Sequence, residues 1–432
     1  MQYPSWGRYP PAAQQAVPVY WRDQPLPDCP PMLAYGQGRS YGDVCLNDGG
    51  TLMPTQHLDR FIHFDTDRGI LRAEAGVTLA QVIALTLPRG WFLPVTPGTK
   101  FVSLGGAIAN DVHGKNHHQA GSFGCHVRAF ELLRSDGQRL LCTADTHAEY
   151  FQASIGGLGL TGLITWVEID LKAVKSDYIS QQTTRFANLG EFLELNEAME
   201  SQWEYTVAWI DCLARGRRLG RGLYMAGRHE DESQGPIQTI DQPSLKMPVD
   251  APGFLLNRYS VSAFNRLYYH TPRKSLARVP YDGFFYPLDR IANWNRLYGK
   301  RGFFQYQCVL PVDKAEEGLT QILGSVAKSG QASFLSVLKK FGENKAPGLL
   351  SFPRPGFTLA MDMANHGTKT LHLLDRLDDI TMRCNGAVYP AKDARMSAAA
   401  FRQYFPDWPA FSNYIDPAFS SGFWRRVNSE TA

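Results

Sequence analysis

Three glycine-rich segments near the start of the chain constrain its fold more than any other feature. They are residues 36–43 (GQGRSYGD), residues 97–124 (PGT, SLGGAIANDVHGKNHH and GSFG) and residues 156–162 (GGLGLTG). Glycine adopts positive φ easily and leaves backbone N–H groups uncovered, so such loops suit a phosphate-bearing molecule. A single short glycine motif is as often an ordinary tight turn. The ordered set of three is therefore the stronger signal.

The second segment is rich in small residues and carries three histidines. Backbone amides from such a run can follow a long phosphate-bearing cofactor, while His113 could face its redox ring. His113, His117 and His118 could alternatively bind a metal, but no Cys or carboxylate stands at ligand spacing. We therefore predict no metal site.

The third segment contains G-x-G-x-x-G at Gly157, Gly159 and Gly162. A nicotinamide-binding fingerprint must follow a strand and open a helix. Here the following residues, LITWVEIDL, alternate as a strand. The motif fails this test, and a nicotinamide site is not predicted.

Local patterns predict an α+β protein. TLAQVIALTLP predicts a helix with Thr78 as its N-cap and Pro88 as its stop, and GLTQILGSVAKSG predicts a helix that ends at Gly330. FFQYQCVLP has the pattern of a strand, and SFLSVLKKFG is a further apolar segment. At 432 residues, two domains of roughly 150 to 250 residues are expected.

Composition excludes several classes of function. The net charge of +3 gives no basic footprint for nucleic acid, and no apolar run of 18 residues could span a bilayer. The N-terminus lacks the pattern of a signal peptide, so a cytoplasmic protein is expected. The seven cysteines are scattered without C-x-x-C spacing, which predicts reduced thiols in apolar surroundings.

Residues 228–253 are polar, contain prolines and show neither helical nor strand periodicity. They are expected to form a long mobile loop that covers a site. If the substrate is attached to a lipid, this loop is the candidate for peripheral contact with the inner membrane.

The three glycine segments together resemble the FAD domain of the vanillyl-alcohol-oxidase-like flavoproteins. More narrowly, DVHGKNHH, FFQYQCVLP, SFLSVLKKFG and YPAKDARM are similar to the decaprenylphosphoryl-β-D-ribose 2-oxidase family, from about Pro31 to the C-terminus. The resemblance implies a two-domain PCMH-type FAD-binding fold whose substrate domain is built on an antiparallel sheet. The implied division is 1–176 for the first part of the FAD domain, 177–386 for the substrate domain and 387–432 for a segment that completes the FAD domain.

The resemblance also implies a set of FAD contacts. They fall on the first two glycine segments, with two contacts elsewhere: Ala34, Gly36, Gly38, Arg39, Ser40, Tyr41, Gly42, Asp43, Gly98, Ser103, Leu104, Gly105, Gly106, Asn110, Asp111, Val112, His113, Ile164 and Tyr389. Several relatives attach FAD covalently through a histidine in the first loop. This chain has Arg39 there, so non-covalent FAD is predicted.

For the substrate, the matching positions are Gln305, Gln307, Lys339 and Lys392, with Asn365 as a further candidate. The implied catalytic residues are Lys392, Gln307, Lys339, His113 and Tyr41. An ammonium suits a phosphate, and a lysine whose pKa is lowered by burial can accept a hydroxyl proton. Without the resemblance, a solvated surface lysine would be the commoner fate of Lys392.

Two positions depart from the family. Ala360 stands where mycobacterial members have a cysteine that nitro-aromatic inhibitors capture, and Phe285 stands where an aromatic hydroxyl is expected. The first change removes that inhibitor chemistry and leaves turnover intact. The second leaves details of substrate binding open.

The implied reaction is oxidation of the ribose C2 hydroxyl of a polyprenyl-phosphoryl ribose to the 2-keto sugar, with hydride passing to the flavin. A separate NAD(P)-dependent keto-reductase would then complete epimerisation to the arabinose donor. The alternatives are a flavin oxidase of a free polyol or sugar lactone, and a non-catalytic flavin-binding protein. The sequence leaves the electron acceptor and the lipid length open.

Overall fold

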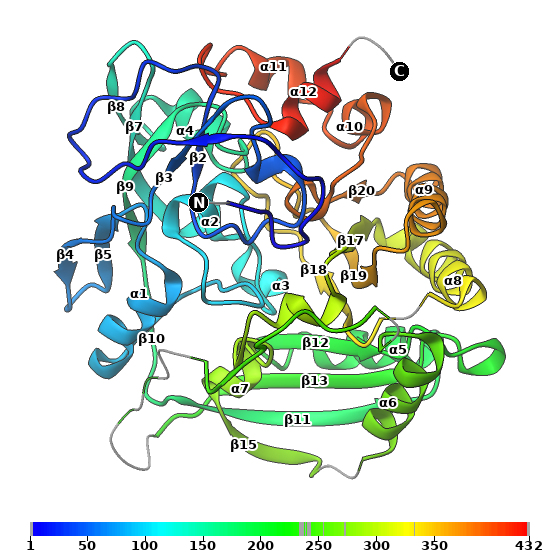
Figure 1. Ribbon diagram of the computed structural model, residues 1–432. Helices are drawn as coiled ribbons and strands as arrows, with labels where there is room; N and C mark the ends of the chain where they lie inside the picture. Colours follow the sequence, from blue (N-terminus) through cyan, green and yellow to red (C-terminus); the bar gives the residue numbers. More distant parts are fainter. Residues whose placement is uncertain are drawn as a thin grey trace.

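A computed structural model describes residues 3–232, 237, 239, 243–253, 255–271, 274–331 and 333–429. Figure 1 shows two regions, one formed by the blue and cyan N-terminal part with the red C-terminal helices, the other by a large sheet with helices outside it. Short 3-10 turns lie at Asp43–Cys45, Leu87–Arg89, Phe123–His126, Gly216–Arg218, Trp294–Tyr298 and Pro390–Lys392.

The N-terminal region is built on two small sheets. The first is parallel, in the order β1 (Gln15–Ala16), β3 (Thr51–Pro54), β2 (Met32–Tyr35). The second is antiparallel, in the order β4 (Phe61–Asp65), β5 (Ile70–Glu74), β9 (Leu163–Asp170), β7 (Val127–Leu133), β8 (Arg139–Thr143). The strand β9 follows the third glycine segment directly, as its alternating pattern predicts. Between the strands lie β6 (Trp91–Phe92), which pairs with β10 (Lys172–Ala173), and the helices α1 (Leu79–Thr86), α2 (Leu104–Ala109), α3 (His117–Ala120) and α4 (Ala148–Ser154).

The helix predicted after Thr78 is confirmed as α1. The Thr78 side chain accepts a hydrogen bond from the Gln81 N–H, and the Gln81 side chain accepts one from Thr78 in return, so both exposed N–H groups are satisfied. Leu79, Val82 and Ile83 are buried on one face. The α-helix ends two residues before Pro88, which lies in the following 3-10 turn.

The second region contains an eight-stranded antiparallel sheet. Its order is β15 (Leu276–Pro280), β11 (Tyr178–Phe186), β13 (Gly222–His229), β12 (Tyr205–Ile210), β18 (Ser336–Phe341), β19 (Gly356–Ala364), β17 (Phe303–Leu310), β20 (Ala387–Val388). The α+β class predicted from the sequence is confirmed. The segment that starts at residue 387 begins as an edge strand of this sheet.

Helices cover both faces of the large sheet. On one face lie α5 (Leu189–Met199), α8 (Val312–Ser329) and α9 (Thr368–Arg383). The predicted end of α8 is confirmed, because Gly330 adopts φ 68° there. On the opposite face lies α6 (Arg258–His270), whose Tyr269 packs on Trp209 and Leu223. The short α7 (Tyr281–Phe285) follows β15.

The described part of residues 228–253 is more ordered than the sequence suggested. Strand β13 continues to His229, and β14 (Leu245–Lys246) pairs in parallel with β16 (Ile291–Ala292). Asp250 accepts hydrogen bonds from Arg8 and Arg296 at 2.7 and 3.1 Å. The expectation of a loop without regular structure is wrong for residues 228–229 and 245–246, whereas the other described residues of this stretch belong to no helix or strand. Residues 233–236, 238 and 240–242 lie outside the described residues.

The C-terminal helices return to the N-terminal region (Figure 1). They are α10 (Ala398–Tyr404), α11 (Trp408–Ser412) and α12 (Gly422–Asn428). Arg426 in α12 pairs with Asp43 and with Asp393, at 2.6 and 3.0 Å. The two ends of the chain therefore build one structural unit around the first glycine loop.

Two sequence expectations concern the chain as a whole. Within the described residues, no helix is long and apolar enough to cross a membrane. The seven cysteines are free thiols, but only Cys142, Cys212, Cys308 and Cys384 are buried; Cys125 is exposed, against expectation.

Candidate active site

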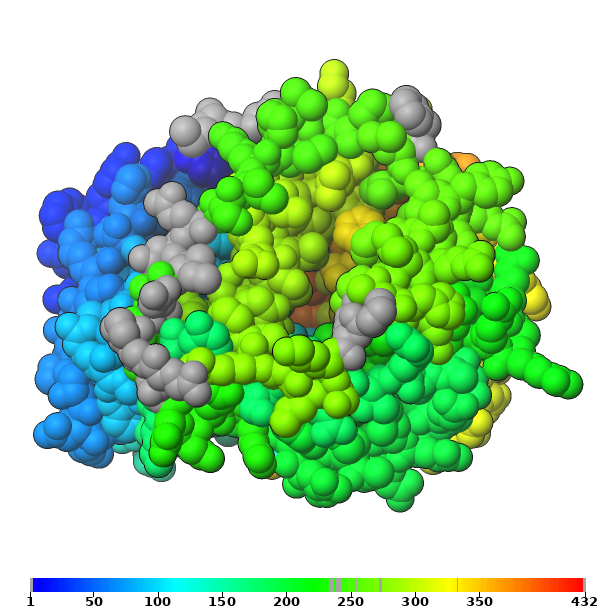
Figure 2. Space-filling view, turned by 90° about the horizontal axis from the view of Figure 1, so that it is seen from below, coloured from blue at the N-terminus to red at the C-terminus, as the bar shows by residue number. Residues whose placement is uncertain are grey.

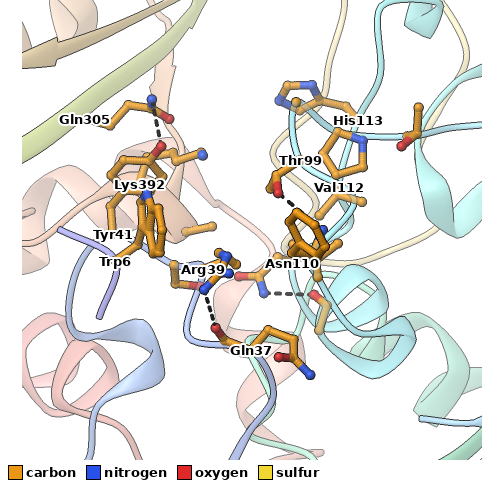
Figure 3. A pocket seen from close by; sticks show the side chains of 18 of the residues that line it. Trp6, Gln37, Arg39, Tyr41, Thr99, Asn110, Val112, His113, Gln305 and Lys392 are labelled. Carbon is orange, nitrogen blue, oxygen red and sulfur yellow. Dashed lines mark hydrogen bonds between the residues drawn. The ribbon is translucent and has the colours of Figure 1, made fainter. Parts of the chain in front are cut away.

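A cavity of about 700 Å³ lies between the glycine loops and the inner face of the large sheet. This volume is in the range of cofactor and substrate sites. The opening is seen in Figure 2. Figure 3 shows Gln305, Lys392 and Tyr41 on one side of the cavity, facing Thr99, Asn110 and His113 on the other. The glycine loops form the part called here the loop wall, and β17, β18, β19 and the 3-10 turn at Pro390–Lys392 contribute the other lining residues named below.

The first glycine loop is packed too closely for side chains at two positions. A Cβ on Gly36 would lie 2.4 Å from the Ser103 Oγ, and Gly38 has φ 60° with the Tyr35 ring against it. Beside them, the Arg39 guanidinium lies over the Trp6 ring at 4.2 Å and donates to the Gln37 carbonyl at 2.9 Å (Figure 3). Trp6 is a cavity residue that the sequence analysis missed, because only the fold brings it to the loop.

Most of the predicted FAD contacts line this cavity. They are Ala34, Gly36, Gly38, Arg39, Ser40, Tyr41, Gly98, Ser103, Gly105, Gly106, Asn110, Val112, His113, Ile164 and Tyr389. Four others are not among the lining residues. Leu104 is in the core and Asp43 pairs with Arg426, while Gly42 packs against the Asp393 carbonyl. Asp111 is buried and accepts hydrogen bonds from Gly124 N–H and Ser351 Oγ. These four contacts with FAD stay predictions.

The loop wall fits a large cofactor with phosphate groups. Gly98 faces open space, with no atom within 4 Å of the position of a Cβ. Asn110 lines the cavity, and its buried Oδ1 has no hydrogen-bond partner within the part of the chain that the structure describes. A bound group with an N–H donor would satisfy this acceptor. Arg39 adds a fixed positive charge to the same wall.

The opposite end of the cavity carries three half-buried lysines. Burial lowers the pKa of Lys115 to about 7 and, with the charges of Lys115 and Lys392, lowers that of Lys339 to about 7. Burial also lowers the pKa of Lys392 to about 8, although the negative charge of Asp362 acts in the opposite direction and raises it. The Lys392 ammonium lies 4.1 Å from the centre of the Tyr41 ring. Lys115 was not among the predicted substrate residues, and it donates to the Phe284 carbonyl.

His113 joins two of the predicted substrate residues. Its Nε2 is 2.9 Å from Gln307 Nε2, and its Nδ1 is 2.9 Å from Lys339 Nζ. Burial, and then the Lys339 charge, hold the pKa of His113 well below its usual range, so the imidazole is neutral. The Lys339 Nζ also donates to the Gly114 carbonyl at 2.8 Å. The network fixes the Lys339 amine at the cavity wall.

Gln305 and Tyr41 are held by a buried carboxyl group. Gln305 Nε2 donates to the Tyr41 hydroxyl at 3.2 Å and to Asp362 Oδ1 at 2.5 Å (Figure 3 shows the first bond). Burial raises the pKa of Asp362 to about 7. Asp362 lies on β19, two residues after Ala360, and was not predicted from the sequence. The pairing of β17 with β19 places it opposite Gln305.

The remaining named positions divide into two groups. Ala360 and Phe285 line the cavity, as their family positions imply. Asn365 does not line it; its side chain donates to the Arg301 carbonyl at 3.1 Å. Within the described chain, no group of three His, Cys, Asp or Glu is placed to hold a metal ion.

Comparison with known proteins decides the family. Residues 30–143 match the family model described as "FAD binding domain". The decaprenylphosphoryl-β-D-ribose oxidase of Mycolicibacterium smegmatis is 35% identical over 415 residues, which is 92% of this chain and 89% of that protein. The chain belongs to the decaprenylphosphoryl-β-D-ribose oxidase family. The predicted family and FAD as cofactor are thereby confirmed, and the protein is an FAD-dependent oxidoreductase that acts on a CH–OH group.

Similarity to two oxidoreductases of other names covers a smaller part of the chain. The human Δ(24)-sterol reductase is 32% identical over 119 residues, or 28% of this chain and 23% of that protein. The L-gulonolactone oxidase of Bos taurus is 29% identical over 172 residues, or 39% of this chain and 38% of that protein. By contrast, the match within the decaprenylphosphoryl-β-D-ribose oxidase family extends through the large sheet and Lys392.

Proposed function

We propose that the protein oxidises the C2 hydroxyl of a polyprenyl-phosphoryl ribose to the 2-keto sugar. The observation that carries this proposal is the group of half-buried lysines, Lys115, Lys339 and Lys392, at one end of the cavity. Asp289 is the one carboxylate among the described residues that line the cavity. Charging Lys115 and Lys339 side by side is costly without an anion, and a substrate phosphate supplies one.

The chain's residues divide the work of binding and proton transfer. When bound, FAD supplies the acceptor for the C2 hydride. Lys392 has a pKa of about 8 and lies at the cavity surface, so its amine form can accept the hydroxyl proton. Gln305 and Tyr41 fix the wall beside it. Lys339, held by His113, and Gln307 orient the phosphoryl sugar.

The product chemistry defines the next step. A 2-keto sugar must be reduced from the opposite face to become the arabinose donor, which requires an NAD(P)-dependent keto-reductase. The lipid on the substrate requires peripheral contact with a membrane. Both partners belong to this proposal.

Anaerobic mixing with a short-chain prenyl-phosphoryl ribose tests the proposed substrate. The expected result is rapid bleaching of the visible flavin band, with a 2-keto sugar as the product. A free polyol or an aldonolactone should leave the band intact. Bleaching by those compounds alone would favour a lactone or polyol oxidase, the activity that the similarity to L-gulonolactone oxidase suggests, and would overturn the phospho-sugar substrate.

Proton uptake should accompany substrate binding. The free pKa values of Lys115 and Lys339 are about 7, so both amines are largely neutral at pH 8. A bound phosphate raises these pKa values, so protons are taken up and affinity falls as the pH rises above about 7. Calorimetry at pH 8 in buffers of different ionisation enthalpy should show the uptake. If the binding enthalpy is the same in all buffers, no proton is taken up, and Lys115 and Lys339 do not bind the phosphate as proposed.

The FAD is proposed to be bound without a covalent bond. Arg39 occupies the loop position where relatives carry an attachment histidine, and its guanidinium is fixed over Trp6. Acid precipitation of the holoenzyme should therefore leave all of the flavin in the supernatant. Flavin that remains in the pellet after washing would show that another residue forms the bond.

A further inference from the structure

Large exposed apolar side chains gather in one short part of the chain. Twelve such residues occur among the described residues, and seven of them lie between residues 245 and 276: Leu245, Val249, Leu255, Tyr259, Phe264, Leu267 and Leu276. Soluble proteins rarely expose apolar side chains in clusters unless a partner covers them. The described residues of this stretch, 243–253, 255–271 and 274–276, with α6 at their centre, are called here the α6 rim.

Helix α6 presents three of these side chains, Tyr259, Phe264 and Leu267. Its buried face carries Val261, Asn265 and Tyr269, and the Asn265 amide donates to Asp211 at 2.9 Å. On the outer face, Tyr259 and Leu267 are 82% and 70% exposed. Tyr259 and Leu267 are eight residues apart and thus project from similar sides of the helix. The apolar face is therefore a stable feature of the fold.

The exposed charged side chains of the described residues between 243 and 290 have one sign. They are Lys246, Arg258, Arg266, Lys274, Arg278 and Arg290, of which Arg278 pairs with Glu230; exposed carboxylates stand outside this range, at Asp231 and Glu232. The carboxylates described in this range are covered: Asp250 pairs with Arg8 and Arg296, and Asp282 and Asp289 are buried. Apolar side chains between exposed cations are typical of a surface that binds anionic lipid.

The α6 rim is continuous with the active-site cavity. Tyr268 of α6 lines the cavity, as do Trp209 and Met225 of the sheet beneath it. The Trp209 and Tyr268 rings are 4.8 Å apart. Figure 2 looks into the opening from this side, with green to yellow-green residues on its rim and orange C-terminal residues deep inside. An apolar wall thus runs from the lysines to the rim.

We propose that the α6 rim docks on an anionic lipid bilayer and that the lipid tail of the substrate passes along Trp209, Met225 and Tyr268 into the membrane. The part about the tail rests on the proposed function. Docking itself depends only on the exposed apolar and basic side chains, so the two can fail separately.

Vesicle flotation of the holoenzyme tests the docking. The wild-type protein should float with phosphatidylglycerol-containing vesicles and much less with phosphatidylcholine vesicles, and high salt should weaken binding. The double variant Tyr259→Ser, Leu267→Ser should lower the partition coefficient at least tenfold, as should Arg258→Glu, Arg266→Glu. Leu141→Ser is the matched control, since Leu141 is 48% exposed on β8, far from residues 243–276 in sequence.

Activity on a short, water-soluble prenyl-phosphoryl ribose separates docking from function. The Tyr259→Ser, Leu267→Ser variant should turn over this substrate at the wild-type rate and lose activity only on long-chain substrate in vesicles. Equal flotation of variant and wild type would overturn the docking surface. If the wild type binds no vesicles but forms dimers that the variant lacks, the rim is an interface between copies and the membrane assignment is wrong. Failure with the soluble substrate alone would overturn the function and leave docking intact.

Discussion

Replacement of Lys392 by methionine should lower the rate of flavin reduction by about 10²- to 10⁴-fold, the range for loss of a positioned proton acceptor. Methionine keeps the length of the side chain over the Tyr41 ring and removes the amine. The wild-type rate at saturating substrate should also rise with pH as the Lys392 ammonium, of pKa about 8, loses its proton. The variant should lose this rise. Stopped-flow absorbance under anaerobic conditions measures both effects.

Lys340→Met is the matched control for this prediction. Lys340 is on the same sheet, on β18, but faces away from the cavity and pairs with Glu200 at 2.6 Å. Its loss should leave the rate of flavin reduction within about twofold, because this half-buried pair lies on the side of the strand away from the cavity. If the Lys392→Met enzyme has full flavin content and reduces its flavin at the wild-type rate, Lys392 is not the proton acceptor. If neither the wild type nor the variant reduces its flavin with substrate, the protein is a non-catalytic flavin-binding protein.

The largest effect on stability is expected at Asp282. Its carboxylate accepts from Lys100 at 2.5 Å, and both side chains are nearly completely buried. Asp282→Ala removes this partner and leaves Lys100 in a medium of low polarity. The free energy of unfolding should fall by about 3 to 5 kcal/mol. Chemical denaturation of the holoenzyme, followed by tryptophan fluorescence, measures the change.

Two comparisons make the Asp282 result specific. Arg128→Ala removes an exposed ion pair with Asp170, in which both side chains are about 40% exposed or more, and should cost less than about 1 kcal/mol. The double variant Lys100→Met, Asp282→Leu removes both charges and should recover most of the stability lost in Asp282→Ala. A double variant that is less stable than the single one would mean that packing, rather than the loss of the Asp282 charge beside Lys100, determines the fall in stability.

Local features of the fold were predictable because they depend on near neighbours. The cap at Thr78 and the end of α8 at Gly330 are set by hydrogen bonds and backbone angles within a few residues. The strand after Gly162 was predictable for the same reason, since its alternating pattern is local. The α+β class follows from such elements together.

The parts of the site that were missed depend on contacts between distant residues. Trp6 meets Arg39 only after the chain folds, and Asp362 meets Gln305 only through the register of β19 on β17. The pairing of Leu245–Lys246 with β16 has no periodic signature, because two-residue strands are too short to show one. For Lys392, sequence reasoning depended on the family resemblance, since nothing local distinguishes a buried lysine from an exposed one.

The contact between Arg426 and Asp43 joins residues that are 383 positions apart. During synthesis at about 5 to 20 residues per second, the first glycine loop emerges early and waits roughly 20 to 80 s for its partner. The loop that contributes to the FAD wall is thus completed only when the last helix has left the ribosome. We therefore expect FAD to load only after α12 has been synthesised, and nascent chains that stall before α12 should accumulate as apoprotein.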